Sequence, residues 1–268
     1  MSLLRLSLPF SLAFGSRRAG RLVERNLYVY RRGWLVIFSG AFEPLFYLLS
    51  IGFGIGALVG SVTGADGRPI EYTLFVAPAL LATASMNGAI YDSTFNIFFK
   101  LNYQKTYDAI LSTPLGPGDV AVGEVIWALI RGTLYAIGFL VVMGLLGLIR
   151  TPLALLAVPG AMLIGFAFAA VGMAATTFMR KWQDFDLVQL VILPLFLFST
   201  TFYPLDVYPE PFRTIVTLTP LYHSIELIRD LTIGPLDAGI LVHIGYLVAM
   251  GLLGLSIVSG RLGKLLLK

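Results

Sequence analysis

LTPLYHSIELIRDL, residues 218–231, lies between two apolar runs that are each long enough to cross a membrane. The stretch nevertheless contains a proline and several ionisable side chains, among them Pro220, His223, Glu226 and Arg229. Charged side chains are costly in lipid, yet the stretch is too apolar for an ordinary surface loop. The way in which the chain accommodates this segment therefore determines how many times it crosses the membrane.

The composition indicates an integral membrane protein. Hydrophobic residues make up 57% of the 268 residues and charged residues 13%, and the mean hydropathy is +0.84, whereas about one quarter of the residues of a soluble domain are charged. The absence of cysteine excludes disulfides and cysteine-ligated metals, and two histidines are too few for a histidine metal cluster. The net charge of +4 does not indicate a nucleic-acid partner, because the basic residues follow membrane topology.

The hydropathy pattern predicts an all-α integral membrane fold with six transmembrane helices. A helix needs about 20 mostly apolar residues to cross the hydrocarbon core. Six runs meet that requirement, at residues 34–60, 73–95, 121–149, 152–179, 185–203 and 239–259.

The basic residues predict the orientation of these helices, because lysine and arginine gather on the cytoplasmic side. With both termini inside, fourteen basic residues lie on the inner face and four on the outer face, and Arg131 lies within a span. The inner residues are Arg5, Arg17, Arg18, Arg21, Arg25, Arg31, Arg32, Lys100, Lys105, Arg180, Lys181, Arg261, Lys264 and Lys268, and the outer ones are Arg68, Arg150, Arg213 and Arg229. Both termini are therefore expected in the cytoplasm.

Residues 1–33 are expected to form a cytoplasmic tail and an amphipathic helix on the membrane surface. A helix over residues 17–34 places five arginines on one arc and Val23, Leu27, Tyr30 and Trp34 on the opposite arc. An ordinary positive flank would explain these charges but not their segregation. The opening LLRLSLPFSLAFGS is similar to a short signal-peptide core, but cleavage after it would export the arginine cluster, which the charge bias opposes.

Three glycines recur at four-residue spacing in the first predicted span, at Gly52, Gly56 and Gly60. Such a stripe lets another helix backbone approach closely, and that helix belongs either to this chain or to a second copy. Two carboxylates also lie in predicted spans. Glu43 is either a functional group or a structural pin to a neighbouring helix, and Asp92 is expected near the inner interface.

The inner loop between the second and third spans, KTYDAILSTPLGPGDVAVGE (residues 105–124), predicts a short helix that stops at a proline- and glycine-rich segment. Tyr107, Ile110 and Leu111 fall on one apolar face of this helix. Either lipid headgroups or a soluble partner protein could bury that face.

The segments EPLFYLLSIGFGIGALVG (43–60), KTYDAILSTPLGPGDVAVGE (105–124) and FYPLDVYPEPFRTIVTLTPLYHSIELIRDLTIG (202–234) resemble those of permease subunits of bacterial ABC-2 type (type V) exporters. Within that superfamily the chain is most similar to the nodulation-factor, or lipooligosaccharide, permease branch, and daunorubicin-type drug permeases are more distant. The resemblance covers nearly the whole chain from about residue 24.

The resemblance implies roles for several segments of a transmembrane domain over residues 34–268. Residues 105–113 match a coupling helix that docks on a separate ATPase through Tyr107, Asp108, Ile110 and Leu111. The family works as a dimer of permeases, either two copies or two related chains, so the glycine stripe would lie near the seam. Residues 204–234 match re-entrant helices that cap the extracellular exit, and the residues of this lid are Tyr203, Pro204, Pro220, His223, Glu226 and Arg229.

One departure from the family pattern concerns this lid. Related permeases commonly have Ser-Gly shortly before the aromatic-Pro step, whereas this chain reads STTFYP, with Thr200 in place of the glycine. The departure puts in doubt how the lid hinges. His223 is expected either to be a hydrogen-bonded structural residue or to contact a cargo headgroup.

The expected function is that of the permease subunit of an ATP-binding cassette exporter in the bacterial plasma membrane. It would move an amphipathic substrate outward, either a glycolipid or lipooligosaccharide or a hydrophobic drug. The chain has no phosphate-binding loop of the form GxxxxGK[ST], so ATP and Mg²⁺ are expected on a separate ATPase, with no catalytic or metal-binding residues on this chain. The alternatives are a membrane scaffold that recruits an ATPase without transporting and a lipid-modifying membrane enzyme.

Overall fold

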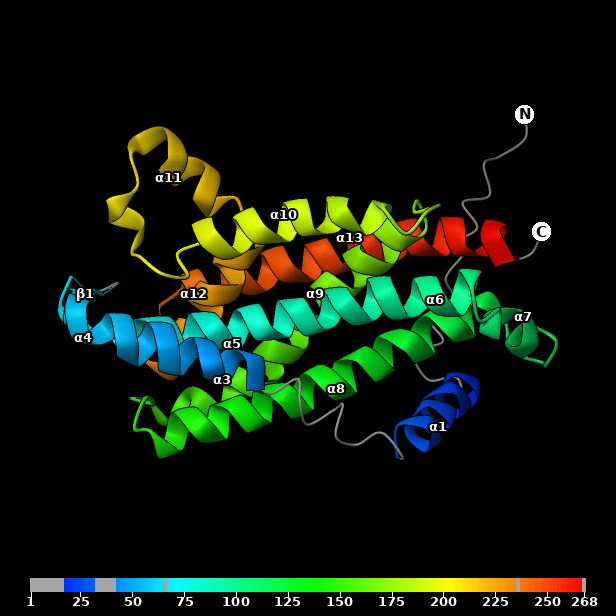
Figure 1. Cartoon of the computed structure of the whole chain (residues 1–268), viewed down its shortest axis with the longest axis horizontal. Helices are drawn as coiled ribbons and strands as arrows, with labels where there is room; N and C mark the ends of the chain where they lie inside the picture. The colour runs from blue at the N-terminus through cyan, green and yellow to red at the C-terminus, as the bar shows by residue number, and fades with distance from the viewer. Residues whose placement is uncertain (1–16, 32–41, 65–66, 235–236, 267–268) are drawn as a thin grey trace.

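The computed structural model describes residues 17–31, 42–64, 67–234 and 237–266. Its long helices run nearly parallel to one another along the long axis of the molecule (Figure 1). Within the described residues, five helical stretches are long and apolar enough to cross a membrane. They are Phe42–Val59 (α3, Phe42–Tyr47; η1, Leu48–Ile55; α4, Gly56–Val59), Tyr72–Asn102 (α5, Tyr72–Tyr91; η2, Asp92–Asn96; α6, Ile97–Asn102), Gly118–Leu145 within α8 (Pro117–Leu145), Pro152–Thr176 (η3, Pro152–Leu156; α9, Ala157–Thr176) and Gly239–Val258 within α13 (Gly239–Leu266).

The helix at the fifth predicted span is shorter than expected. The sequence predicts residues 185–203, but α10 covers Asp184–Phe198, which is 15 residues. At about 1.5 Å per residue this helix is about 22 Å long, less than the hydrocarbon thickness of about 30 Å. It stops because the backbone turns at Ser199 and Thr200, where Thr200 adopts φ +61°.

The long helix that begins with α5 lies at the centre of the bundle. It packs against α9, α12, α8 and η1, and it is the most buried of the five candidate spans. On the far side, α13 packs closely on α9 through glycine. A Cβ atom at Gly254 would lie 2.7 Å from the backbone carbon of Ala170, so only glycine allows this approach.

The glycine stripe of the first span packs inside this chain. A Cβ at Gly52 or Gly56 would come within 3.4 Å or 3.1 Å of Thr73, the second residue of α5. The hydroxyl of Thr73 donates a hydrogen bond to the carbonyl of Gly52 at 3.0 Å. Gly60 has a different role, because its φ of +73° ends the helix and no atom lies near its Cβ position. The sequence left open whether a helix of this chain or of a second copy packs on the stripe. At Gly52 and Gly56 it is α5 of this chain.

The all-α expectation requires one correction. A short antiparallel hairpin, β1 (Ser61–Thr63) and β2 (Pro69–Glu71), connects the first and second candidate spans. Val62 pairs with Ile70 at its centre. Each strand has three residues, which is too few for an alternating hydropathy pattern to reveal.

The charged segment at residues 218–231 forms a helix over most of its length. Between α10 and α13 the chain makes a single turn, η4 (Leu205–Val207), and then α11 (Glu210–Thr217) and α12 (Pro220–Thr232). α11 projects from the end of the bundle, whereas α12 packs against α5 and α13 (Figure 1). Thr219 caps α12 by accepting a hydrogen bond from the backbone N–H of Tyr222 at 3.3 Å.

Helix α1 (Arg17–Arg31) packs across α8, and its buried face differs from the predicted one. Ala19, Leu22 and Asn26 are buried, whereas Leu27 of the predicted apolar arc is 61% exposed. A Cβ at Gly123 of α8 would lie 2.6 Å from Leu22, so this glycine makes room for α1. Residues 1–16, together with Arg32 and Trp34 of the predicted arcs, lie outside the described residues.

Candidate functional site

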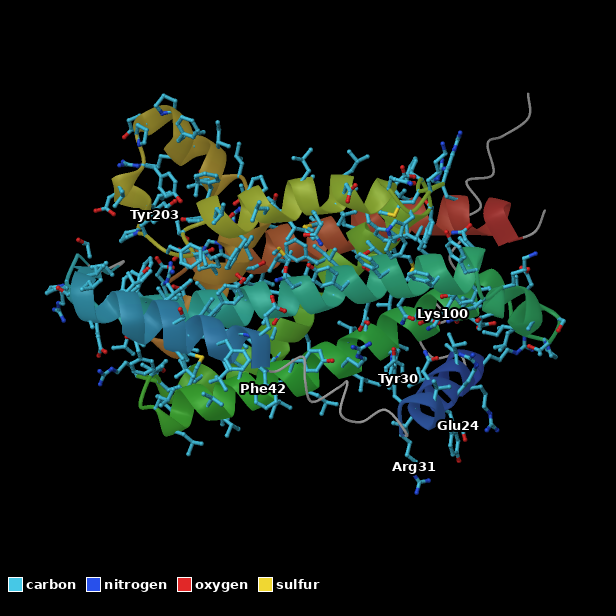
Figure 2. All side chains as sticks on the ribbon, viewed as in Figure 1. Glu24, Tyr30, Arg31, Phe42, Lys100 and Tyr203 are labelled. Atoms are coloured by element: carbon cyan, nitrogen blue, oxygen red, sulfur yellow. The ribbon has the colours of Figure 1, made fainter. Side chains whose placement is uncertain are left out.

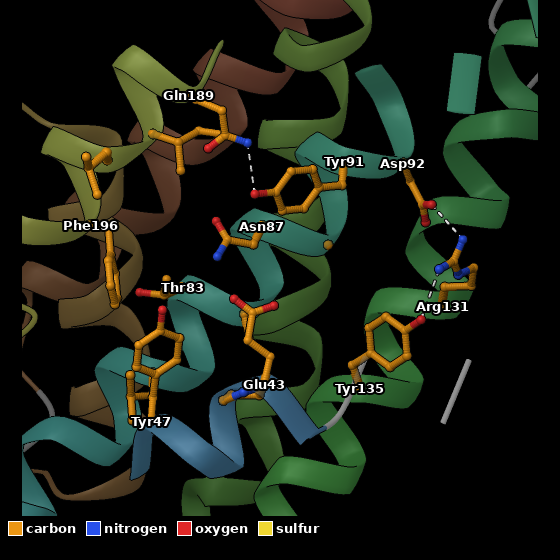
Figure 3. Close-up of a pocket in the computed structure, with 16 residues that line it drawn as sticks. Glu43, Tyr47, Thr83, Asn87, Tyr91, Asp92, Arg131, Tyr135, Gln189 and Phe196 are labelled. Atoms are coloured by element: carbon orange, nitrogen blue, oxygen red, sulfur yellow. Dashed lines mark hydrogen bonds and ion pairs between the residues drawn. The ribbon is translucent and has the colours of Figure 1, made fainter. Parts of the chain in front are cut away.

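A pocket of about 300 Å³ opens between α3, α5, α8 and α10 (Figure 3). One part of its lining is polar, with residues that belong to three separate candidate spans and to α10. These polar residues are Glu43, Thr83, Asn87, Tyr91, Asp92, Arg131, Tyr135 and Gln189. The other part is apolar and aromatic, and includes Tyr47 and Phe196, whose rings meet edge to face with centroids 5.6 Å apart. The pocket therefore offers both polar and apolar contacts.

Asp92 and Arg131 form an ion pair in this pocket. The Nη1 atom of Arg131 lies 2.6 Å from Oδ1 of Asp92, and the two side chains are 13% and 12% exposed. Arg131 also donates hydrogen bonds to the hydroxyls of Tyr135 at 3.0 Å and Tyr30 at 3.3 Å. Charges at membrane depth are stabilised by such partners. The pairing links the carboxylate and the arginine that the sequence analysis had placed within spans but had not joined.

Three other polar groups line the pocket and have no partner among the residues that the structure describes. The Glu43 carboxylate points toward the face of α5 that bears Thr83 and Asn87 (Figure 3). The hydroxyl of Thr83 and the Oδ1 atom of Asn87 are buried and have no hydrogen-bond partner among the described residues. Close by, the amide of Gln189 donates to the hydroxyl of Tyr91 at 3.0 Å and connects α10 to α5.

The predicted coupling segment forms a short helix, α7 (Thr106–Leu111). Its apolar face is already covered by this chain: Tyr107 is 1% and Ile110 8% exposed, and both belong to a core cluster with Leu22. Asp108 is exposed and Leu111 is half-buried. The expectation that a partner or lipid is needed to bury this face is therefore wrong for Tyr107 and Ile110, because α1 and α8 bury it.

A second ion pair, missed by the sequence analysis, lies beside this cluster. Lys100 of α6 contacts both carboxylate oxygens of Glu124 of α8 at 2.8 Å, and the side chains are 9% and 4% exposed. The sequence carried one signal for it, because two opposite charges adjoin consecutive apolar helices on the same side of the membrane.

Arg229 organises the opposite end of the bundle. Its guanidinium contacts Glu226 at 2.5 Å and donates to the backbone carbonyls of Thr200 at 3.1 Å and Phe75 at 3.3 Å. Its Cζ atom lies 4.0 Å from the centre of the Phe75 ring. Glu226 and Arg229 are spaced i, i+3 on α12, and their ion pair is largely buried, with side chains 16% and 8% exposed.

The other predicted lid residues belong to the same segment between α10 and α13. Tyr203 and Tyr208 are in ring contact at 5.3 Å, Pro204 precedes η4, and Pro220 opens α12. A second pocket, of about 380 Å³, includes Pro204, Glu226 and Arg229 in its lining.

The two histidines of the chain meet at the junction of α12 and α13. Their Nδ1 atoms are 2.8 Å apart, and the His223 ring stacks on Tyr246 with centroids 4.0 Å apart. Burial lowers the pKa of His223 below its ordinary value of 6.5, and the nearby His243 lowers it further. This pairing agrees with the structural reading of His223. Within the described residues, no group of three or more His, Cys, Asp or Glu side chains is arranged to hold a metal ion.

Comparison with known proteins gives two findings. The sequence profile of the ABC-2 type transporter family matches residues 18–233. The chain is also similar to nodulation protein J of Rhizobium leguminosarum bv. viciae, at 33% identity over 89% of this chain and 93% of that protein. The same protein from R. leguminosarum bv. trifolii is 34% identical, and that from Rhizobium meliloti is 31% identical, each over 84% of both chains.

Proposed function

Because the chain belongs to the ABC-2 type transporter family, as a relative of nodulation protein J, we propose that it is the permease subunit of an exporter driven by a separate ATPase. Its substrate is amphipathic, either a glycolipid or lipooligosaccharide or a hydrophobic drug. The observation that carries this proposal is the pocket between α3, α5, α8 and α10, which combines hydrogen-bonding groups with aromatic walls inside a bundle of apolar helices.

The proposed topology has six crossings, with α10 as the fifth and both termini in the cytoplasm. In support, α7, the end of α13 and α1 lie toward one end of the bundle, and the β-hairpin and α11 lie at the other (Figure 1). Among the described residues, basic ones gather toward the end with α7, including Arg18, Arg21, Lys105 and Arg180. In this orientation η4, α11 and α12 form the extracellular lid.

The ATPase, which carries ATP and Mg²⁺, docks on the exposed side of α7. Asp108 and Ser112 are exposed there, and the neighbouring arginines of α1 extend the same surface. Because Tyr107 and Ile110 are buried against α1 and α8, they would transmit a movement of α7 and would not touch the ATPase themselves.

A contact chain leads from this docking surface to the pocket. Leu22 of α1 belongs to the same core cluster as Tyr107, and Tyr30, two turns further along α1, accepts a hydrogen bond from the Arg131 guanidinium at 3.3 Å. In Figure 2, Tyr30 lies on the side of α1 that faces α8. A push on α7 would thus reach the Asp92–Arg131 pair through α1.

The glycine stripe does not supply the dimer seam, since Gly52 and Gly56 are filled by α5 of the same chain. A second permease, whether a copy or a related chain, would instead pack against the exposed apolar faces of α10 and η1, where Leu187, Leu190 and Phe53 are exposed.

The test is reconstitution of the chain with its ATPase in lipid vesicles. Export predicts nucleotide-dependent movement of an amphipathic cargo, whereas ATPase binding without any transport would favour the scaffold alternative. Asp108→Arg should weaken ATPase binding by about tenfold, because it reverses the charge of an exposed docking residue. Asp206→Arg, an exposed carboxylate on η4 at the other end, is the matched control and should leave ATPase binding unchanged.

A further inference from the structure

The pocket between α3, α5, α8 and α10 contains more hydrogen-bond acceptors than the protein satisfies. The Thr83 side chain is 4% exposed, yet its hydroxyl has no partner among the described residues, and neither has Oδ1 of Asn87. Burying such groups without a partner is costly. The Glu43 carboxylate, which also takes part in none of the ion pairs of the described chain, faces the same space (Figure 3).

The charges of the pocket do not cancel. Its lining contains two acidic residues, Glu43 and Asp92, and one basic residue, Arg131. Arg131 is held by Asp92 at 2.6 Å and by two tyrosine hydroxyls, so its positive charge is already compensated. Glu43, an exposed residue in the first turn of α3, is therefore left as the acidic group of the pocket that has no basic partner among the described residues.

Aromatic rings line the same pocket as Glu43. Tyr47, Tyr91, Tyr135 and Phe196 line the pocket, and their faces attract cations. A ligand that donates hydrogen bonds and carries one positive charge would satisfy the open acceptors, neutralise Glu43 and contact the rings. A carboxylate or phosphate would instead be repelled by Glu43 and would find the arginine occupied.

From these observations we infer that the pocket binds the protonated amine of an amphipathic ligand, with Glu43 as its counter-ion and Thr83 and Asn87 as hydrogen-bond acceptors. The apolar tail would leave through the open side of the pocket past Leu193 and Phe196 of α10. As a statement about the cargo the inference rests on the proposed transport function, because it narrows the substrate to amphiphiles with a cationic headgroup.

The test uses the full chain purified in a polyoxyethylene detergent, which has neither charge nor amine nor sugar. Three photoreactive probes share an eight-carbon tail and differ in their headgroup: octylamine, octyl glucoside and octanoate. The labelled peptides are mapped by mass spectrometry. We expect octylamine to label peptides of α3, α5 and α10 at the lowest concentration. Equal or stronger labelling of these peptides by octyl glucoside or octanoate would overturn the inference, and this ranking needs no variant.

Single substitutions test the role of each pocket residue in binding octylamine. Glu43→Gln should raise the half-saturating concentration of octylamine by about tenfold or more, and Thr83→Val by about threefold, because a charged hydrogen bond contributes more than a neutral one. Asp186→Asn removes an exposed carboxylate of α10 outside the pocket and should have no effect. An unchanged octylamine concentration in a folded Glu43→Gln protein would refute the role of Glu43.

The labelling needs no ATPase. A chain that binds octylamine but moves no cargo with ATP would refute the proposed transport function and leave this inference intact. A chain that exports a neutral or anionic amphiphile without binding octylamine would refute this inference and support the proposed transport function.

Discussion

The two ends of the bundle each contain a buried pair of a basic residue and a glutamate. One pair joins two helices, whereas the other lies within one helix and binds backbone carbonyls of other segments. Lys100 and Glu124 belong to α6 and α8, and the lysine contacts both carboxylate oxygens at 2.8 Å. Arg229 and Glu226 belong to the same helix, α12, and the remaining arginine bonds go to the backbone carbonyls of Thr200 and Phe75. Lys100 and Tyr203 mark these opposite ends in Figure 2.

The two pairs suit the two ends of the bundle to different movements. At the end with α7, the charges join two long helices, so they cannot separate without two charges losing their partners. At the other end, one guanidinium holds the turn after α10, where Thr200 has φ +61°, an unfavourable value for a β-branched residue. The first end is suited to transmit force, and the second can open locally while the helices stay packed.

The largest effect is expected from breaking the first pair. Glu124→Ala leaves the Lys100 ammonium buried without its partner, so the free energy of unfolding should fall by about 3–5 kcal/mol. Thermal unfolding in lipid nanodiscs measures this loss. The double variant Lys100→Met with Glu124→Leu should recover most of it, because no charge remains unpaired. A loss below about 1 kcal/mol in the single variant would contradict the interpretation.

A smaller loss is expected at the other end. Arg229→Met removes the bonds to Glu226, Thr200 and Phe75, and should lower the free energy of unfolding by about 2–3 kcal/mol. Hydrogen exchange should quicken around residues 199–205 while α5 stays protected. Arg213→Met, at the same end but 35% exposed at its side chain, is the matched control and should cost about 1 kcal/mol or less. Equal exchange in both variants would mean that Arg229 does not hold the turn.

A gain in stability is expected from Thr200→Gly. A left-handed backbone costs a non-glycine residue about 1–2 kcal/mol, and the variant relieves that cost while it loses the bond from the Thr200 hydroxyl to Glu226 at 3.3 Å. The net gain should be about 0.5–1 kcal/mol. Thr201→Gly, whose φ is not positive, should destabilise instead. Unfolding temperatures that fall in both variants would show that Thr200 is not strained.

The smallest effect is a pH dependence confined to the end with α12. Burial and His243 hold the pKa of His223 below 6.5, so the stability that neutral His223 contributes is present above pH 6.5 and is lost as the pH falls. His223→Gln should therefore lose less stability than the wild type between pH 7.5 and about 5.5. Unfolding temperatures across this range measure the difference.

Asp230, on the same helix, makes stability depend on pH in the opposite direction. Burial, with the charges of Glu226 and Asp237, raises the pKa of Asp230 to about 7, so its contribution is lost as the pH rises through 7. Asp230→Asn should thus lose more stability on acidification than the wild type. Identical pH profiles for the two variants would contradict both assignments.

The sequence predicted the apolar helices well but located their ends less well, and the ends contain the missed ion pair. The second span was expected to stop at residue 95 and the third to begin at residue 121, whereas the helices continue to Asn102 and begin at Pro117. Lys100 therefore lies in a packed helix and not in the loop expected after residue 95, and Glu124 lies two turns into α8 and not at its first turn. Hydropathy marks where a helix can contact lipid, but it does not mark where a helix continues beyond the lipid.

Periodicity likewise identified the packing faces of helices, but not the segments that pack against them. The apolar face of α7 was found correctly, but only the fold shows that α1 and α8 cover it. The glycine stripe indicated close packing and could not say that α5 fills it. Thr200 was different. Related permeases commonly have glycine at this position, which indicates a left-handed backbone, and Thr200 does have a φ of +61°. A local conformational requirement can be read from sequence, whereas a contact between distant segments cannot.

The central position of α5 has a consequence for how the protein is made. This helix leaves the ribosome second among the five candidate spans, before α8, α9 and α13, yet it is the most enclosed of them in the finished bundle. The threonines and serine on its buried faces, Thr73, Thr83 and Ser85, must therefore wait beside lipid or the insertion machinery until α9 is synthesised. Nascent chains that end before α9 should accordingly be the ones that membrane proteases recognise.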